Sequence, residues 1–203
     1  GNLGEGQSVV RFRPFRSPHH TTSRIGLIGG GSNPMPGEIS LAHRGVLFLD
    51  EFPEFPRHVL EALRQPMEDG VVTISRAAGT VAYPSQFSLI AAANPCPCGY
   101  FGSEIKPCTD LPGQISRYQK RISGPILDRI DIHVEVPHLK VEKLMGAETK
   151  GETSAQIQRR VQRARELQLK RFRGTKLKSN AEMSTKQVRI FAKLAQECEI
   201  LMR

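Results

Sequence analysis

The amino-acid sequence predicts an α/β protein in which helices sandwich a parallel β-sheet, with a β-hairpin insertion and a small all-α domain. Residues 46–49 (VLFL) form a short apolar run that is typical of a strand buried on both faces. Residues 87–94 (FSLIAAAN) indicate a second buried strand, which ends on a polar side chain. Because a helical segment separates the two, we expect a layered α/β core with ligands at the carboxyl ends of its strands.

The first forty residues are rich in proline and glycine and therefore predict loops. The glycine triplet at 29–31 invites interpretation as a phosphate-binding loop, but such a loop needs Lys and then Ser or Thr after its last glycine. Residues 32–34 are Ser-Asn-Pro instead, so we expect a mobile loop here.

Helical periodicity follows the first strand. Pro56 suits the first turn of a helix, and Pro66 is expected to end or kink it because proline has no N–H to donate. The apolar side of this helix carries Val59, Leu60, Leu63 and Met67.

Two further segments predict β-structure. Residues 71–84 indicate a β-hairpin, with arms at Val71–Ser75 and Thr80–Tyr83 and Gly79 in the turn. The alternating segment at 131–137 (DIHVEVP) predicts a third strand of the sheet.

Beyond residue 137 the pattern is helical. Two capping boxes, Thr153–Gln156 and Ser184–Gln187, open amphipathic helices, and the second helix is expected to run to the last residue. We therefore expect an α/β core at 1–137 and a helical domain at 138–203.

Charge divides the chain in the same way. Residues 1–136 hold 13 basic and 13 acidic side chains, whereas residues 137–203 hold 16 basic and 7 acidic ones, so the helical domain carries the whole net charge of +9. This asymmetry favours an anionic partner, with a solvated helix face as the alternative. No apolar run approaches the roughly 18 residues of a membrane span, so we expect no membrane partner. Four cysteines predict a reducing, cytoplasmic environment, in which metal binding or burial is favoured over disulfides.

Asp50 and Glu51 directly follow the first strand. One carboxylate at a strand end can hold Mg²⁺ while its neighbour reaches an attacking water, a division that phosphoryl transfer needs. An exposed acidic turn is the alternative. Asn94 ends the second strand and is expected at the same crevice, unless it only forms a turn before Pro95.

Arginines and cysteines supply further candidates. Arg121 and Arg129 flank a short predicted helix, where each could form a local ion pair or reach a phosphate on another subunit. One loop carries possible zinc ligands, since a thiolate cluster can hold a loop too polar to pack; these are Cys96, Cys98, Cys108 and Asp110. Three reduced cysteines without metal are the alternative. His19 and His20 have no carboxylate near them in the sequence and are interpreted as structural or polymer-contacting.

Five longer segments stand out: FRSPHHTTS, GGGSNPMPGEISLAHRGVLFLDE, LEALRQPMEDGVVTISRAAGTV, AAANPCPCGY and RISGPILDRIDIHVEVP. Together they resemble the magnesium-chelatase-like AAA+ ATPases of the YifB/ComM (competence protein) type. The resemblance covers nearly all of residues 11–137, and the basic segment looks more loosely like an AAA+ lid. It implies an AAA+ P-loop-NTPase-type sheet, the cofactors ATP and Mg²⁺, and a homo-oligomeric ring, a hexamer, in the full-length protein.

The resemblance also implies residue roles. Asp50 would bind Mg²⁺, Glu51 would be the catalytic base, and Asn94 would be sensor 1. Arg129 would be the arginine finger that acts across a subunit interface, with Arg121 as second choice.

The same resemblance places the 71–84 hairpin in the pore of the ring. Arg76, at its tip, would contact a threaded polymer, and Arg159 and Arg163 of the basic domain are the other candidate contacts to single-stranded or branched DNA.

Two departures from the family matter. No G-x-x-x-x-G-K-[ST] motif occurs in the sequence, and the lid arginine called sensor 2 is expected beyond Arg203. The sequence is therefore interpreted as a middle fragment of an ATPase, which binds ATP weakly at best and does not turn it over alone.

Three functions are compatible with these features. The first is an AAA+ ring motor on DNA, a helicase or branch-migration factor of the ComM type. The second is a motor subunit that drives metal insertion into a porphyrin, and the third is a non-enzymatic adaptor that binds nucleic acid and zinc. The FRSPHHTTS and NPCPCGY segments favour the first over the second, and the intact acid pair argues against the third.

Overall fold

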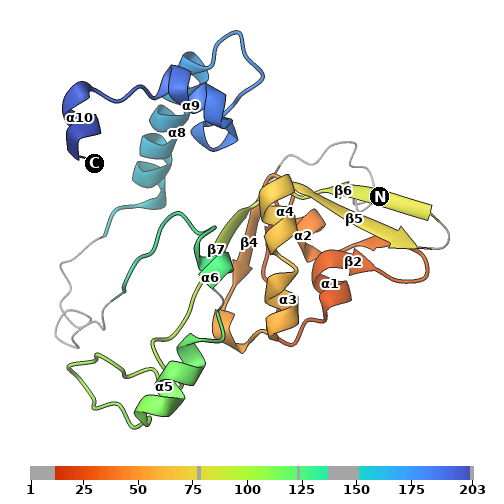
Figure 1. Cartoon of the computed structure of the whole chain (residues 1–203), viewed down its shortest axis with the longest axis vertical. Coiled ribbons are helices and arrows are strands. Elements are labelled where there is room, and N and C mark those ends of the chain that lie inside the picture. The colour runs from red at the N-terminus through yellow and green to blue at the C-terminus, as the bar shows by residue number, and fades with distance from the viewer. Residues whose placement is uncertain (1–11, 77–78, 123, 137–150, 202–203) are drawn as a thin grey trace. The chain divides into compact units, whose positions relative to one another are not determined.

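The computed structural model describes residues 12–76, 79–122, 124–136 and 151–201 (Figure 1). The chain divides into two compact units, Gly1–Leu139 and Lys140–Arg203. The first unit contains, in chain order, β1 (Phe15–Arg16), α1 (Arg24–Ile28), β2 (Gly29–Gly30), β3 (Met35–Pro36), α2 (Glu38–Leu41), β4 (Val46–Leu49), η1 (Phe52–Glu54), α3 (Arg57–Glu61), α4 (Arg64–Asp69), β5 (Val71–Arg76), β6 (Gly79–Pro84), β7 (Ser88–Ala91), α5 (Pro112–Gln119) and α6 (Gly124–Leu127). The second contains α8 (Ser154–Arg171), η2 (Asn180–Glu182), α9 (Thr185–Phe191) and α10 (Gln196–Leu201).

A three-stranded parallel sheet organises the first unit. Its strand order is β1-β4-β7, so the apolar run at 46–49 is the central strand. Val46 pairs with Phe15 on one side and with Ser88 on the other. The predicted α/β class with a parallel sheet is thus confirmed.

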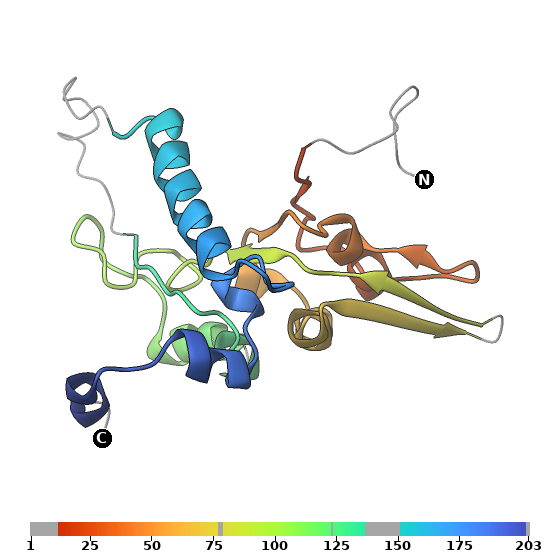
Figure 2. The ribbon, with the colours of Figure 1, turned by 90° about the horizontal axis from the view of Figure 1, so that it is seen from above.

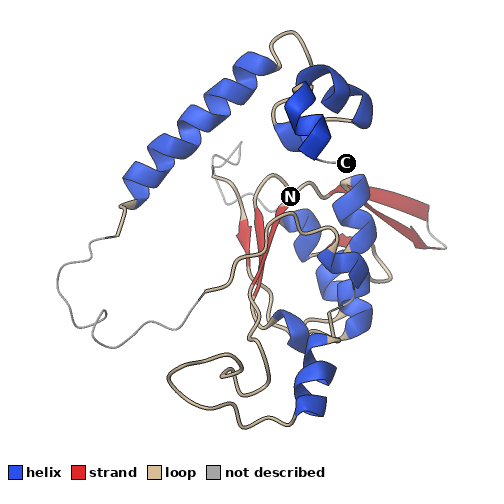
Figure 3. Ribbon diagram, turned by 60° about the vertical axis from the view of Figure 1, so that its left-hand side comes forward, coloured by secondary structure: helices blue, strands red, loops and turns tan. Residues whose placement is uncertain are grey.

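The hydrophobic core lies on one face of this sheet. Leu47 and Leu49 of β4 are fully buried beneath side chains from the helices, among them Leu27, Ile39, Val59, Leu60 and Leu63. On the opposite face Phe15 stacks on Phe48 with ring centroids 6.2 Å apart, yet Phe15 and Ile90 are 65% and 50% exposed. In the described part of the first unit, the helices therefore stand on one side of the three strands (Figure 3).

The helical segment after β4 is divided in two. Pro66 has no N–H to donate to the carbonyl of Ala62, and the first helix, α3, ends at Glu61 with Ala62 as its C-cap. Pro66 itself lies in the first turn of α4, where a missing N–H costs little. The expected break therefore occurs, but one turn before the proline, and α4 continues through it to Gly70 in the left-handed region.

Two hairpins lie side by side on one flank of the unit (Figures 1 and 2). In the longer one β5 pairs with β6 from Val71–Pro84 to Arg76–Gly79, close to the predicted arms. The shorter one pairs β2 with β3. The Tyr83 hydroxyl donates a 2.8 Å hydrogen bond to the carbonyl oxygen of Pro34 and thereby joins the two.

The glycine triplet is not the mobile loop that its composition suggested. Gly29 and Gly30 form β2, and a Cβ on Gly29 would lie 2.5 Å from the Met35 carbonyl oxygen and 2.9 Å from Ile74 Cδ1. Glycine is required here because two backbones and a core side chain approach too closely for any other residue. The triplet serves packing between the hairpins.

The strand predicted at 131–137 is also absent from the described residues, 131–136. This segment has no regular structure, and Ile132, Val134 and Val136 are 77%, 76% and 88% exposed. Alternation gives a segment strand propensity, but a strand also needs a neighbour to pair with. Residues 15–16 supply the third strand of the sheet instead.

The second unit begins its helices as predicted. Thr153 caps α8 and Ser184 caps α9, each in a reciprocal capping box with the glutamine three residues later. Phe172 is buried against the edge of Phe191, with ring centroids 5.2 Å apart. The last helix was expected to be continuous, but Ala192 leaves the helical region at φ −127° and ψ 48°, so α9 and α10 are separate.

One-sided burial of the sheet gives a testable asymmetry. We expect Leu47→Ala to lower the free energy of unfolding of this chain by about 2–5 kcal/mol, because it opens a cavity in the core. The matched change Ile90→Ala, on the exposed face, should alter it by less than about 1 kcal/mol. Urea denaturation followed by circular dichroism measures both, and equal losses would contradict the one-sided core.

Candidate functional site at the carboxyl edge of the sheet

The two candidate acids and the candidate asparagine leave the sheet at the same edge. Leu49, the last residue of β4, pairs with Ala91, the last residue of β7. The backbones stay joined beyond that pair, since the Ala92 N–H donates to the Leu49 carbonyl oxygen at 3.0 Å and the Phe52 N–H donates to Ala92 at 2.9 Å. Asp50–Glu51 and Asn94 therefore follow neighbouring strand ends, and all three side chains are exposed.

The turn at the acid pair has an uncommon backbone. Glu51 adopts the left-handed region, with φ 51° and ψ 43°, which few residues with a Cβ occupy. The Asp50 Oδ1 oxygen accepts a 2.9 Å hydrogen bond from the Glu51 N–H and supports this turn. Sparsely populated backbone conformations gather at functional sites, where surrounding contacts maintain them.

A distant loop reaches Glu51. The Nδ1 atom of His20 lies 2.9 Å from Glu51 Oε2, and the rings of His19 and His20 contact each other with centroids 4.0 Å apart and planes tilted by 36°. The carboxylate partner of His20 therefore comes from a distant part of the sequence, which the interpretation of these histidines did not include. The contact joins segments 31 positions apart, and no local sequence pattern signals such a pair.

Both candidate arginine fingers are engaged within the chain. Arg129, in the turn after α6, forms an ion pair with Glu68 of α4 and donates to the Pro125 carbonyl oxygen. Arg121, just after α5, forms an ion pair with Glu54 at 2.6 Å, next to the acid pair.

A basic cavity lies beside this edge. Its volume is about 770 Å³, and it lies between the segment that follows β4 and helix α5. Its charged lining residues are Glu54, Arg57, Arg117, Lys120 and Arg121. Four cations against one carboxylate make the cavity attractive to anions.

The candidate polymer contacts lie elsewhere. Arg76 is the last residue of β5, and a Cβ added to Gly30 would lie 3.4 Å from its Nη2 atom, so its guanidinium reaches over the neighbouring hairpin. In the second unit, Arg159 and Arg163 are exposed and one turn apart on α8.

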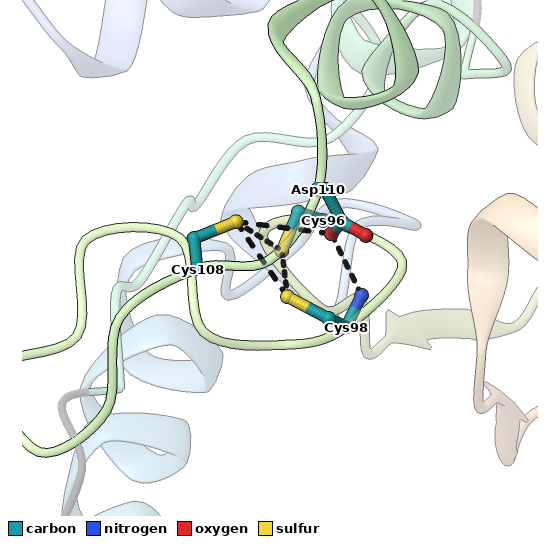
Figure 4. Close-up of side chains that lie close together, drawn as sticks. All are labelled: Cys96, Cys98, Cys108 and Asp110. Carbon is teal, nitrogen blue, oxygen red and sulfur yellow. Dashed lines mark hydrogen bonds between the residues drawn. The ribbon is translucent and has the colours of Figure 1, made fainter.

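The candidate zinc ligands meet in the loop between β7 and α5 (Figure 4). The three sulfur atoms of Cys96, Cys98 and Cys108 lie 3.4, 3.5 and 3.7 Å from one another. Asp110 Oδ2 lies 3.8 Å from Cys108 Sγ and accepts a 2.8 Å hydrogen bond from the Cys98 N–H. Hydrogen bonds from the Cys96 thiol and the Cys98 N–H lower the pKa of Asp110, so its carboxylate is ionised at neutral pH.

None of the described helices is both long enough and apolar enough to cross a membrane.

The parallel sheet and the helices that cover it define a protein of the α/β class. The particular family follows from comparison with known proteins. Residues 2–144 match the family "Magnesium chelatase, subunit ChlI", and residues 151–203 match "Magnesium chelatase, subunit ChlI C-terminal". The chain belongs to this magnesium chelatase family, which confirms the family predicted from the sequence motifs.

Comparison with individual relatives agrees with this family assignment. The chain is 48% identical to protein YifB of Escherichia coli (strain K12), over 97% of this chain and 38% of that protein. It is 48% identical to competence protein ComM of Haemophilus influenzae, over 90% of this chain and 35% of ComM. Magnesium-chelatase subunit ChlI of Bigelowiella natans is 26% identical over 56% of this chain and 25% of that subunit. The chain thus spans a little more than a third of the YifB and ComM relatives.

Among solved structures, NtrX from Brucella abortus in complex with ADP is 21% identical, with a TM-score of 0.39. The match covers 61% of this chain and 24% of NtrX.

Proposed function

We propose that this chain forms part of an ATP-hydrolysing AAA+ ring motor that acts on DNA, as a helicase or branch-migration factor of the ComM type. The observation that carries the proposal is the acid pair at the end of the central strand, β4, beside the strand end that leads to Asn94. It occurs in a member of the magnesium chelatase family that is 48% identical to competence protein ComM.

The donor set at the sheet edge suits magnesium and a nucleotide. Carboxylate and amide oxygens are the hard ligands that Mg²⁺ prefers, usually together with substrate phosphates. Asp50 would hold the ion, which supplies charge neutralisation at the phosphates when bound. Glu51 would accept a proton from the attacking water, and His20 at 2.9 Å would orient its carboxylate. Asn94 would hydrogen-bond the water or the γ-phosphate.

Arg129 would act on a nucleotide bound by a neighbouring subunit of a homo-oligomeric ring, a hexamer. Its guanidinium is paired with Glu68 in this chain, so it must exchange that carboxylate for a phosphate when the ring assembles. Glu68 is 51% exposed and Arg129 is 24% exposed, so the pair is partly open to competition from a phosphate oxygen. Arg121, the second choice, would exchange Glu54 in the same way.

A metal-insertion motor of the chelatase type is the second candidate. The family description favours it, and the chain is 26% identical to the ChlI subunit of Bigelowiella natans. The higher identity to ComM, over a larger part of the chain, ranks the DNA motor first. DNA binding separates the two, because a chelatase subunit has no need of it.

The catalytic assignment predicts a selective loss of hydrolysis. In a protein of the relatives' full length that contains this chain, Glu51→Gln should slow ATP turnover by about 100-fold or more, because the general base is lost. Nucleotide affinity should stay near the parent value. The matched control Asp69→Asn, an exposed acid at the end of α4, should leave turnover unchanged. A phosphate-release assay measures turnover, and binding of a labelled nucleotide measures affinity. Undiminished turnover in Glu51→Gln would contradict the assignment of Glu51 as general base.

The 203-residue chain alone should behave differently. Its sequence contains no G-x-x-x-x-G-K-[ST] motif, and Gly29–Gly30 form a strand, so we expect weak ATP binding and no turnover. Calorimetric titration with ATP and a phosphate-release assay test this, and clear turnover by the chain would contradict it.

The DNA assignment predicts charge-specific effects. Arg76→Glu should weaken binding of this chain to labelled single-stranded and branched DNA and reduce the slope of log K against log salt by about one unit. The double variant Arg159→Glu/Arg163→Glu should reduce the slope further, while Arg24→Glu, an exposed arginine at the start of α1, serves as the charge-matched control. Fluorescence anisotropy at several salt concentrations measures this. Equal losses in Arg76→Glu and Arg24→Glu, with about twice that loss in the double variant, would indicate only non-specific attraction.

A further inference from the structure

The loop between β7 and α5 requires a stabilising interaction of its own. Residues 92–111 contain no helix or strand, although segments of this length without regular structure are uncommon in compact domains. The loop has little apolar interior of its own, yet Cys96 is fully buried. The structured feature at its centre is the group of three sulfur atoms and one carboxylate shown in Figure 4.

The spacing of these atoms matches the coordination shell of a tetrahedral metal. A Zn–S bond of about 2.3 Å and tetrahedral angles place two sulfur ligands about 3.8 Å apart. The three observed separations of 3.4, 3.5 and 3.7 Å are close to this value. They are far longer than the roughly 2.05 Å of a disulfide, and all four cysteines of the chain are free thiols.

We propose that Cys96, Cys98, Cys108 and Asp110 bind one Zn²⁺ ion as a closed structural site. The four ligand atoms lie within 4.8 Å of one another, so one ion can contact all of them after small adjustments. The thiols lose their protons on binding, and three thiolates and one carboxylate oxygen then complete the four-coordinate shell. With four protein ligands, no position remains for a substrate.

Backbone groups orient the proposed ligands. The Phe101 N–H donates to Cys96 Sγ at 3.3 Å, and the Cys98 N–H donates to Asp110 Oδ2 at 2.8 Å. Gly99, with φ 81°, donates to the Cys96 carbonyl oxygen at 3.0 Å and closes the turn that carries the first two cysteines. In known metal sites, hydrogen bonds of this kind align the ligand side chains and stabilise the charge of those side chains.

The ligand chemistry selects zinc. Thiolates are soft and disfavour Mg²⁺ and Ca²⁺, which prefer oxygen. A tetrahedral, sulfur-rich set fits zinc or iron, and one carboxylate among the thiolates is a set that zinc accepts.

The site would join the sheet edge to helix α5. Cys96 lies two residues after Asn94, and Asp110 lies two residues before Pro112, where α5 begins. Across the loop, Gln119 of α5 donates to the Pro95 carbonyl oxygen at 3.1 Å. A metal at this position would hold α5, and with it the basic cavity, against the strand ends. This role is independent of ATP hydrolysis and stands whether or not the proposed motor function holds.

Metal analysis of this chain tests the proposal. After growth with added zinc and purification without chelators, the parent chain should contain about one zinc per chain by mass spectrometry of the metal. The control Cys198→Ser, a change at an exposed cysteine of α10, should contain the same. Cys98→Ser and Cys108→Ser should lose more zinc affinity than the roughly 10–100-fold typical of outer-shell changes. Asp110→Cys should retain one zinc, because it restores a fourth thiolate.

Cobalt substitution keeps the test decisive if a serine variant fails to fold, which circular dichroism would show. The parent chain loaded with Co²⁺ should absorb as a tetrahedral thiolate complex, and Asp110→Cys should strengthen the sulfur-to-metal band because one more thiolate binds. A parent chain that takes up neither zinc nor cobalt would overturn the proposal. So would full zinc content in folded Cys98→Ser and Cys108→Ser, and iron in place of zinc would overturn the choice of metal.

Hydrogen exchange tests the structural role. Removal of the metal with a chelator should speed amide exchange in residues 96–110 and in α5. The β5–β6 hairpin should keep its exchange rates, because its hydrogen bonds and its contact with Pro34 do not involve the loop. Unchanged exchange in the loop of a zinc-containing chain would refute the role assigned to the metal.

Discussion

The pairing of β4 with β7 is the constraint on which the candidate site depends. Leu47 and Leu49 anchor the central strand in the core, and the backbone hydrogen bonds between β4 and β7 continue past the last residues of these strands. Because the strands are parallel, both carboxyl ends lie at one edge. Burial and backbone pairing therefore hold together the two strand ends that lead to the acid pair and to Asn94.

Distant segments then complete that edge. His20 contacts Glu51, and Arg121 contacts Glu54, so a loop from before the sheet and a helix from after it both converge on the end of β4. These polar pairs are partly exposed and contribute little to stability. Their value is positional, since they orient carboxylates and keep guanidinium groups close to the edge where a phosphate ligand would bind.

Two kinds of ligand chemistry lie close together in the sequence without overlapping. The acid pair offers hard oxygen atoms that suit magnesium, whereas the loop after Asn94 offers sulfur that suits zinc. The first set is exposed, as a site that exchanges nucleotides must be, and the second has its central cysteine buried, as a structural site should. With both proposed functions, the fold would place nucleotide turnover and permanent metal binding at separate positions.

The sequence by itself determined the features that depend on neighbouring residues. The strand at 46–49, a second strand within 87–94 (observed at Ser88–Ala91), the hairpin around Gly79 and both capping boxes followed from local patterns, because periodicity and turn chemistry act over a few positions. The family followed from the resemblance of longer motifs. Only the tertiary structure decided which segments meet. It replaced 131–136 by Phe15–Arg16 as the third strand, turned Gly29–Gly30 into a packed strand, and gave His20 and Arg129 their carboxylate partners. Contacts between residues far apart in the chain depend on the packing of the whole core, and no short stretch of sequence records them.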